Sequence, residues 1–257
     1  MQDKNFDSLA GKFAKNIYGT LKGDIRSAVL WRDLQEQLPC LGQGKLRILD
    51  AGGGFGFFSQ RLAALGHSVV LCDISAEMLA EARRQIALSP EPLDIECIHA
   101  PIQELDADAL GQFDLILCHA VVEWLADAKG TMTGLLQMLR PGGLFSLMFY
   151  NKDAMCFHAL VAGNFGYVAS GFKAKRVRLS PNFPLTVNEV ESWCREWQFE
   201  VHCRSGVRVI HDYLKKGSLS TEYSDAGLIE MELKYSREAA FLPLGRYVHF
   251  VCQKPTA

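Results

Sequence analysis

Residues 49–75 read LDAGGGFGFFSQRLAALGHSVVLCDIS, and this stretch decides the fold. A short apolar strand ends at Asp50, a glycine-rich loop leads into a helix, and a second apolar run ends at Asp73. Glycines let the backbone approach a ligand closely, and the loop after the first strand of a doubly wound sheet is where such folds bind ligands. A carboxylate at the end of the second strand can accept hydrogen bonds from ribose hydroxyls. The stretch predicts a βαβ unit that holds a nucleotide-like ligand.

The alternation of strand and helix patterns continues along the chain. Apolar runs at 46–51, 67–74, 94–100, 113–120 and 144–150 predict strands, and the segments 58–66, 75–88 and 130–143 have helical spacing. The run 113–120 is nearly continuous in apolar residues, as a central parallel strand should be. These repeats predict an α/β, Rossmann-like fold, with seven mostly parallel strands and helices on both faces.

We expect a single domain, because 257 residues form one large core or one core with an added cap. Residues 1–45 form an N-terminal helical segment and residues 46–150 form the ligand-binding core. Residues 151–185 and 211–243 are predicted to be substrate-reading insertions with a helical cap, and the segments 199–210 and 245–254 are closing strands. Thr186 and Glu189 have the spacing of a capping box that opens a helix.

Charge is distributed unevenly along the chain. The formal net charge is −2, but residues 1–150 hold 13 basic and 18 acidic side chains, whereas residues 151–257 hold 14 and 11. Residues 154–188 contain no acidic residue. Such a window can neutralise nucleic-acid phosphates, although a solvated basic loop would have the same composition. The predicted RNA-binding residues are Lys173, Lys175, Arg176 and Arg178, with Lys215 and Lys216 as an extension and Phe165, Tyr167, Phe172 and Phe183 as stacking candidates.

Other sequence features exclude several classes of protein. The eight cysteines form no CxxC pair and several lie in apolar runs, so we expect buried reduced thiols. The histidines form no metal-binding pair, and no metal is expected. The N-terminus is too polar for a signal peptide, and no apolar run approaches the roughly 20 residues of a membrane span. We therefore expect a cytoplasmic protein.

The glycine loop itself narrows the choice of ligand. A dinucleotide fingerprint would place a glycine where this chain has Phe57, and no P-loop lysine is present. The pattern is instead D-x-G-x-G-x-G, from Asp50 to Gly56, which resembles motif I of class I S-adenosylmethionine (SAM) methyltransferases. A structural glycine turn is the less specific alternative. HAPIQEL (99–105), FDLILCHAVVEWL (113–125) and LRPGGLFSLMFYN (139–151) follow in the order and spacing of that family.

A more specific resemblance runs almost from end to end. The segments NFDSLAGKFAKNIYGTLKGDIRSAVLW, MFYNKDAMCFHALVAGNFGYV, LSPNFP, GVRVIHDYL and LGRYVH are similar to bacterial tRNA 5-carboxymethoxyuridine methyltransferases. This resemblance implies SAM-dependent methylation of the carboxylate on a modified wobble uridine in the tRNA anticodon stem-loop, which gives a methyl ester. The implied cofactor-binding residues are Arg26, Asp50, Gly52, Gly53, Gly54, Asp73, Ile74, Met78, Ile102, Gln103 and His119.

The acceptor chemistry can be judged from the residues alone. A carboxylate is ionised at neutral pH, so it needs no general base, and catalysis becomes a matter of positioning. No residue with a chemical catalytic role is therefore predicted. Arginine can grip a carboxylate through two parallel hydrogen bonds. The candidates for this clamp are Arg208, Arg246, Tyr247 and Tyr150, although each could instead have a structural role.

Three alternatives remain at this point. The first is a methyltransferase on the same core that acts on a small-molecule acid or a quinone precursor, for which an apolar lid would be more suitable than a basic one. The second is a non-catalytic SAM- or nucleotide-binding regulator, which the intact loop and Asp73 disfavour. The third is an enzyme that uses a carboxylated SAM, which would need an additional cation near the methyl group.

Overall fold

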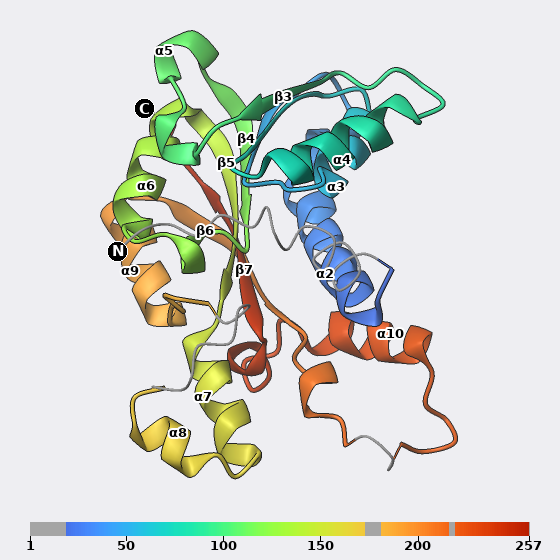
Figure 1. Cartoon of the computed structure of the whole chain (residues 1–257), viewed down its shortest axis with the longest axis vertical. Coiled ribbons are helices and arrows are strands. Elements are labelled where there is room, and N and C mark those ends of the chain that lie inside the picture. The colour runs from blue at the N-terminus through green and yellow to red at the C-terminus, as the bar shows by residue number, and fades with distance from the viewer. Residues whose placement is uncertain (1–18, 173–180, 216–218, 257) are drawn as a thin grey trace.

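The computed structural model describes residues 19–172, 181–215 and 219–256. Its centre is a seven-stranded sheet in the order β3-β2-β1-β4-β5-β7-β6 (Figure 1). Strands β1 to β5 are parallel to one another, and β7 runs antiparallel to both β5 and β6. The strands are β1 (Arg47–Ala51), β2 (Ser68–Asp73), β3 (Ile95–His99), β4 (Phe113–His119), β5 (Leu139–Tyr150), β6 (Glu200–Val207) and β7 (Tyr247–Gln253). The predicted mostly parallel, seven-stranded fold is confirmed.

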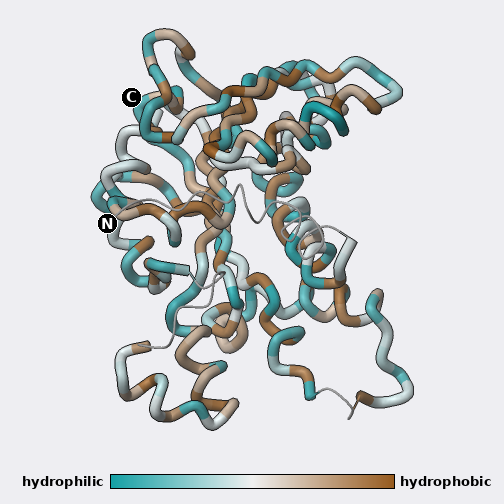
Figure 2. Tube along the Cα trace, viewed as in Figure 1, coloured by the Kyte–Doolittle hydropathy of each residue, from teal (hydrophilic) through white to brown (hydrophobic). Residues whose placement is uncertain are grey.

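Helices cover both faces of this sheet (Figure 1). On one face α2 (Leu21–Gln37) and α3 (Phe57–Ala63) bury Leu30, Leu34 and Leu62 against the strands. On the other face α6 (Ala128–Leu135) and α9 (Val187–Glu196) bury Met132 and Val190. Apolar stretches accordingly run along the central strands, whereas the outer loops are mostly polar (Figure 2). Burial of these side chains from water stabilises the layered arrangement.

Shorter elements complete the first half of the chain. Ser75 caps α4 (Ala76–Ala87) by accepting a hydrogen bond from the Met78 amide. The small helical elements between the strands are η2 (Pro39–Gly42), η3 (Ile102–Glu104), α5 (Ala107–Leu110), η4 (Val122–Trp124) and η5 (Leu136–Met138). The cysteine side chains that the structure describes are free thiols, most of them buried.

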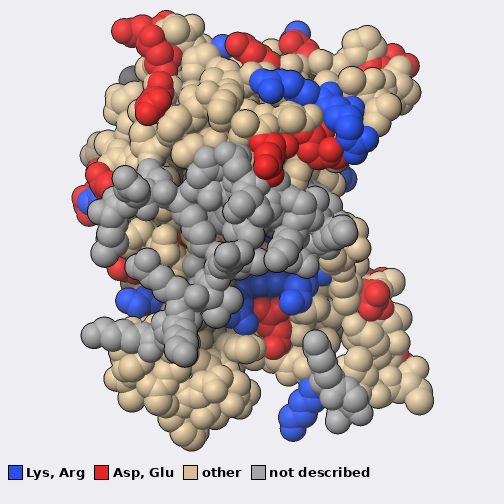
Figure 3. Space-filling view, viewed as in Figure 1, with Lys and Arg blue, Asp and Glu red and all other residues tan. Residues whose placement is uncertain are grey.

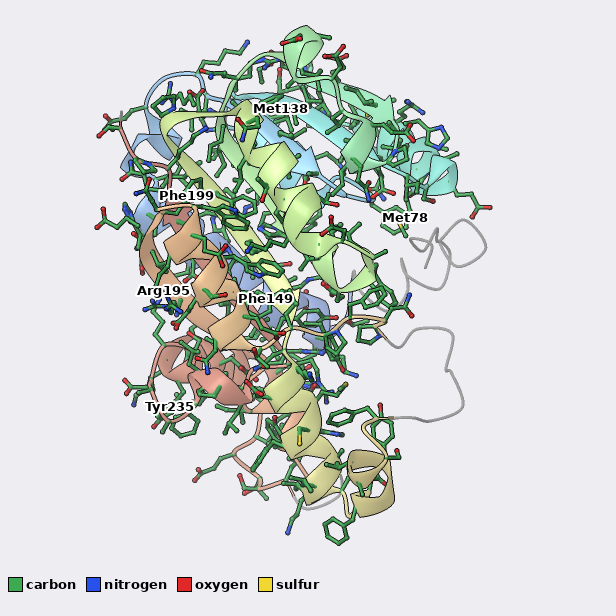
Figure 4. All side chains as sticks on the ribbon, turned by 90° about the vertical axis from the view of Figure 1, so that its left-hand side faces the viewer. Met78, Met138, Phe149, Arg195, Phe199 and Tyr235 are labelled. Carbon is green, nitrogen blue, oxygen red and sulfur yellow. The ribbon has the colours of Figure 1, made fainter. Side chains whose placement is uncertain are left out.

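The additions after β5 gather beyond one end of the sheet (Figure 1). They comprise α7 (Lys152–Val161), α8 (Phe165–Ala169), η6 (His211–Tyr213), α10 (Asp225–Tyr235) and η7 (Leu242–Leu244). The predicted capping box is present, because Thr186 and Glu189 exchange side-chain and backbone hydrogen bonds at the start of α9. The side chain of Phe149 lies on the side of the sheet that α9 covers, and Met78, which belongs to α4, lies well away from it (Figure 4).

Some predicted boundaries were wrong. The Pro-Gly-Gly motif does not end a helix at 143, because β5 begins at Leu139 and contains it. Gly142 has φ +72° and its amide donates to the carbonyl oxygens of Lys254 and Pro255, so the motif forms an irregular start to the strand. Within the predicted 211–243 insertion, the α-helix is α10, which spans Asp225–Tyr235. Of the N-terminal segment, the structure describes α2 and η2, and residues 1–18 lie outside the described residues.

Candidate active site

A cavity opens at the carboxyl ends of β1, β2 and β4, where ligands bind in doubly wound sheets. Helix α2 contributes Arg26 and Leu30 to one wall, and η4 contributes Trp124 to another. All eleven predicted cofactor-binding residues line this cavity: Arg26, Asp50, Gly52, Gly53, Gly54, Asp73, Ile74, Met78, Ile102, Gln103 and His119. Segments that are far apart in the sequence therefore meet at the position that the motifs predicted.

The loop after β1 has no room for side chains. A Cβ atom on Gly53 would lie 2.4 Å from Cγ of Asp50 and 2.5 Å from Cδ1 of Leu71. A Cβ atom on Gly52, which has φ +74°, would lie 2.5 Å from Cγ2 of Val121. Glycine is therefore required here by both backbone conformation and space. The exposed backbone of this loop forms a cradle for a ligand.

Two carboxylates hold the loop in place. The Asp73 side chain accepts hydrogen bonds from the amides of Gly54 and Ser75, each at 2.8 Å. Ser59 on α3 donates to Oδ2 of Asp50 at 2.7 Å. Burial raises the pKa of Asp50 to about 6, although the Ser59 hydrogen bond opposes this shift. Asp50 is thus mainly a structural anchor, whereas Asp73 lines the cavity.

A histidine and an arginine provide polar groups on the opposite wall. His119 ends β4, and its Nε2 is 2.8 Å from Oγ of Ser146. Burial, followed by the charges of His249 and Arg26, lowers the pKa of His119 well below its usual value. The imidazole is therefore neutral near pH 7, and Arg26 brings a positive charge to the same cavity.

The predicted acceptor residues form a second cluster, the acceptor cluster, at the edge of the sheet where β5 and β6 end and β7 begins. Nε of Arg246 donates to Oδ2 of Asp212 at 2.6 Å, and its Nη1 donates to the Tyr150 hydroxyl at 3.0 Å. Nη2 of Arg208 lies 3.4 Å from the same Asp212 oxygen. The guanidinium of Arg208 also lies 5.5 Å from the centre of the Tyr247 ring. The structure therefore brings all four clamp candidates together, around a carboxylate that the sequence reading overlooked.

The charge balance of this cluster favours an anion. Burial would raise the pKa of Asp212, but the hydrogen bond from His211 and the positive charges of Arg208 and Arg246 outweigh it and lower the pKa. Two guanidinium groups thus face one ionised carboxylate. Nε of Arg208 is buried and has no hydrogen-bond partner among the described residues. Figure 3 shows basic and acidic side chains side by side in a hollow in the lower half of the face it displays.

The backbone around Arg208 is held in an unusual conformation. Arg208 has φ +62°, a region that costs a residue with a side chain roughly 1 kcal/mol. The Glu232 carboxylate on α10 accepts hydrogen bonds from the next three amides, those of Val209, Ile210 and His211, at 2.7, 3.0 and 2.7 Å. These bonds fix the turn and offset its strain. The predicted 211–243 insertion therefore stabilises the backbone that carries Arg208.

Glu123 lies between the cofactor cavity and the acceptor cluster. It is 1% exposed, and its Oε2 has no hydrogen-bond partner within the described part of the chain. Burial raises the pKa of Glu123 to about 8, although backbone hydrogen bonds and the charge of Arg26 oppose this. Its charge also contributes to the raised pKa of Tyr247, which places these groups near each other. A neutral Glu123 leaves the positive charge of the neighbouring arginines uncompensated.

Several important residues could not be recognised from the sequence. Asp212 and Glu232 are ordinary acids in a polar segment, and Glu123 follows an apolar strand without any motif. Asn151, next to the clamp candidate Tyr150, is buried, and its Nδ2 donates to the carbonyl oxygens of Pro243 and Gly245. Asn151 is thus structural. The predicted RNA-binding residues Lys173, Lys175, Arg176, Arg178 and Lys216 lie outside the described residues.

Comparison with known sequences identifies the same core. A methyltransferase-domain family model matches residues 49–147. The tRNA 5-carboxymethoxyuridine methyltransferases of two Escherichia coli strains are each 43% identical over 256 residues, which is 99% of this chain and 98% of theirs. A ubiquinone biosynthesis O-methyltransferase of Aromatoleum aromaticum is 35% identical over 118 residues, 45% of this chain and 50% of its own. The first two relatives match the additions as well as the core.

Solved structures show the same architecture. Magnesium protoporphyrin IX methyltransferase from Synechocystis PCC 6803, with bound S-adenosylhomocysteine (SAH), has a TM-score of 0.65 at 16% identity and covers 97% of this chain and 96% of its own. The plantazolicin methyltransferase BpumL gives 0.59 at 13% identity over 96% and 90%. The glycine cradle, Asp73 and Arg26 fit the SAM cofactor of this fold. The identity over nearly its whole length shows that the chain belongs to the tRNA 5-carboxymethoxyuridine methyltransferase family of SAM-dependent enzymes.

Proposed function

We propose that this enzyme methylates the carboxylate of 5-carboxymethoxyuridine at the wobble position of tRNA and forms the methyl ester. The observation that carries the proposal is a pair of partly buried arginines, Arg208 and Arg246, at the end of the sheet beside the cofactor cavity. Their side chains are each only 14% exposed, and together they outnumber the Asp212 carboxylate. Such a site suits an anionic acceptor better than a neutral one.

The chemistry requires positioning by these side chains. SAM supplies a sulfonium methyl group as the electrophile. The acceptor carboxylate is already ionised, so the protein must orient one of its oxygens toward that methyl group. Unpartnered Nε of Arg208 is available to donate to the carboxylate, and Arg246 is oriented by Asp212 and Tyr150. In this proposal, Asp212 keeps the empty clamp ordered and shares the arginines with the substrate.

The partner in this proposal is the anticodon stem-loop of tRNA. Lys173, Lys175, Arg176 and Arg178 would neutralise phosphates without reading the sequence. Phe165 is 65% exposed on α8 and is free to stack on an unpaired base. The amide of Phe183 donates to the carbonyl oxygen of Glu123 at 2.9 Å, which brings the end of the insertion beside η4. A cytoplasmic location is part of the same proposal, because the proposed substrate is a tRNA.

The proposal can be tested with labelled SAM and bulk tRNA from cells that lack this activity. After reaction, the tRNA is digested to nucleosides and treated with mild alkali. We expect label in the modified wobble uridine, and we expect alkali to release it, since an ester hydrolyses and an N- or C-methyl group does not. Label in another nucleoside, or transfer only to small acids in a cell extract, would contradict the proposal.

A charge variant tests the tRNA surface separately. Replacing Lys173, Lys175, Arg176 and Arg178 with Ala should weaken tRNA binding and reduce the slope of log K against log salt by up to about 4 × 0.9. SAM affinity should stay unchanged, because the predicted cofactor-binding residues are other side chains. An unchanged tRNA affinity and salt slope would show that another surface binds the RNA.

A further inference from the structure

A chain of four polar side chains, three of them fully buried, runs through the sheet to the cofactor cavity. Nδ1 of His249 lies 2.8 Å from Oδ2 of Asp33, and Nε2 of His249 lies 2.8 Å from Oγ of Ser146. The same Ser146 oxygen lies 2.8 Å from Nε2 of His119. Asp33, His249 and Ser146 are fully buried, and His119 lines the cavity. The four residues come from α2, β7, β5 and β4.

The far end of this chain is anchored by charge. Arg32 and Arg237 each donate to Oδ1 of Asp33, at 2.7 and 2.6 Å. Arg237 also pairs with Glu36, so two guanidinium groups face two carboxylates. Burial would raise the pKa of Asp33, but the hydrogen bond and charge of His249 and the charge of Arg32 outweigh it and lower the pKa. The Asp33 carboxylate is therefore held in place at the far end of the chain, together with the His249 ring that it contacts.

These hydrogen bonds fix the orientation of both imidazole rings. Asp33 holds Nδ1 of His249, so Nε2 of that ring meets Oγ of Ser146. Ser146 in turn holds Nε2 of His119, because its hydroxyl can donate to one ring while it accepts from the other. Since Nε2 of His119 is bonded to Ser146, Nδ1 is the ring nitrogen that is left to bond a ligand in the cavity.

We propose that Asp33, His249 and Ser146 are positioning residues that hold the His119 ring by its Nε2, so that Nδ1 bonds to the amino-acid end of the cofactor. Arg26 supplies the complementary charge for the carboxylate of that end. Arg26 and Asp33 lie seven residues apart on α2, about two turns along one face of the helix. The Asp33 anchor therefore sets the position of both groups that recognise the zwitterion. This inference rests on SAM as the cofactor.

Removal of the Ser146 hydroxyl tests this recognition directly. The binding of SAH and of 5′-methylthioadenosine is measured by calorimetry, because the second ligand keeps the adenosine and sulfur but lacks the amino-acid end. We expect S146A to bind SAH about 10- to 100-fold more weakly, with unchanged affinity for methylthioadenosine. S146T, which restores a hydroxyl, should recover SAH binding. In nitrogen NMR, the Nε2 signal of His119 should shift in S146A and return toward its wild-type position in S146T.

A matched control is available in the same buried region. Ser205 is fully buried and accepts hydrogen bonds from Arg32 and Arg237, but it is not part of the path to His119. S205A should leave SAH binding within about threefold of wild type. Equal losses for both ligands in S146A would indicate a merely structural role and overturn the proposal, as would unaltered binding of both. If S146A does not fold, H249Q provides the same comparison, and failure of wild type to bind SAH would instead contradict the cofactor assignment.

Discussion

The cofactor side and the acceptor side of this enzyme are built by different means. The cofactor cavity depends on a backbone loop whose glycines leave no room for a Cβ atom, and its walls follow the ends of parallel strands. The acceptor cluster depends on side chains of Tyr150, Arg208, Asp212 and Arg246, which already bond to one another. The first site is therefore determined by local sequence and fold, and the second by a charge balance that several distant segments share.

Among the substitutions that test this difference, a single methyl group added to the glycine loop should have the largest effect, on SAM binding. G53A places Cβ 2.4 Å from Asp50 and 2.5 Å from Leu71, so the cradle must distort. We expect SAM to bind about 100-fold more weakly or not at all in calorimetry. G134A is the matched control, because a Cβ atom there meets no atom within 4 Å. Wild-type affinity in G53A would show that the loop does not hold the cofactor.

Replacement of the clamp arginines should affect only the acceptor. Lysine keeps the charge but cannot form two parallel hydrogen bonds. We expect R246K and R208K each to lower kcat/KM for tRNA by about 100-fold, with SAM affinity changed less than about twofold. R204K, at a more exposed arginine of β6 that pairs with Glu191, should be close to wild type. Equal losses in SAM binding would remove the distinction between the two sides.

The support behind Arg208 should have a smaller effect. E232Q replaces a carboxylate oxygen that accepts backbone hydrogen bonds with an amide that repels them. The turn that carries Arg208 should shift, and kcat for tRNA methylation should fall about tenfold. The exposed E230Q on the same helix is the control. If E232Q remains as active as E230Q, the turn is held by other contacts.

The smallest expected effect is on the pH dependence of thermal stability, through Glu123 between the cofactor side and the acceptor side. Burial raises the pKa of Glu123 to about 8 from an ordinary value of 4.5, so folding favours its protonated form. Its contribution to stability is complete below about pH 4.5 and is lost as the pH rises to about 8. Relative to wild type, E123Q should therefore gain a few °C in Tm at about pH 8.5 compared with pH 5. A constant difference in Tm between these pH values would contradict a neutral Glu123.

The fold and the cofactor residues could be predicted because they have local signals. The alternation of apolar runs with helical segments predicted the parallel strands of the sheet. The spacing of Asp50, Gly52, Gly54 and Asp73 predicted where the cavity opens. Asp212, Glu232 and Ser146 have no such signal, because their roles depend on partners from other elements. The Pro-Gly-Gly boundary was wrong for a related reason. Pairing of Gly142 with the C-terminal segment, which no local pattern indicates, extends β5 through the motif.

The central claim is that the acceptor is the carboxylate of the modified wobble uridine. It is tested most directly with two preparations of one tRNA that differ only at the wobble nucleoside, one with 5-carboxymethoxyuridine and the other with unmodified uridine. With SAM and purified enzyme, we predict one alkali-labile methyl group per molecule of the first tRNA and none on the second, by mass spectrometry of the nucleosides. Equal methylation of both, or a methyl group at any other nucleoside, would contradict the account.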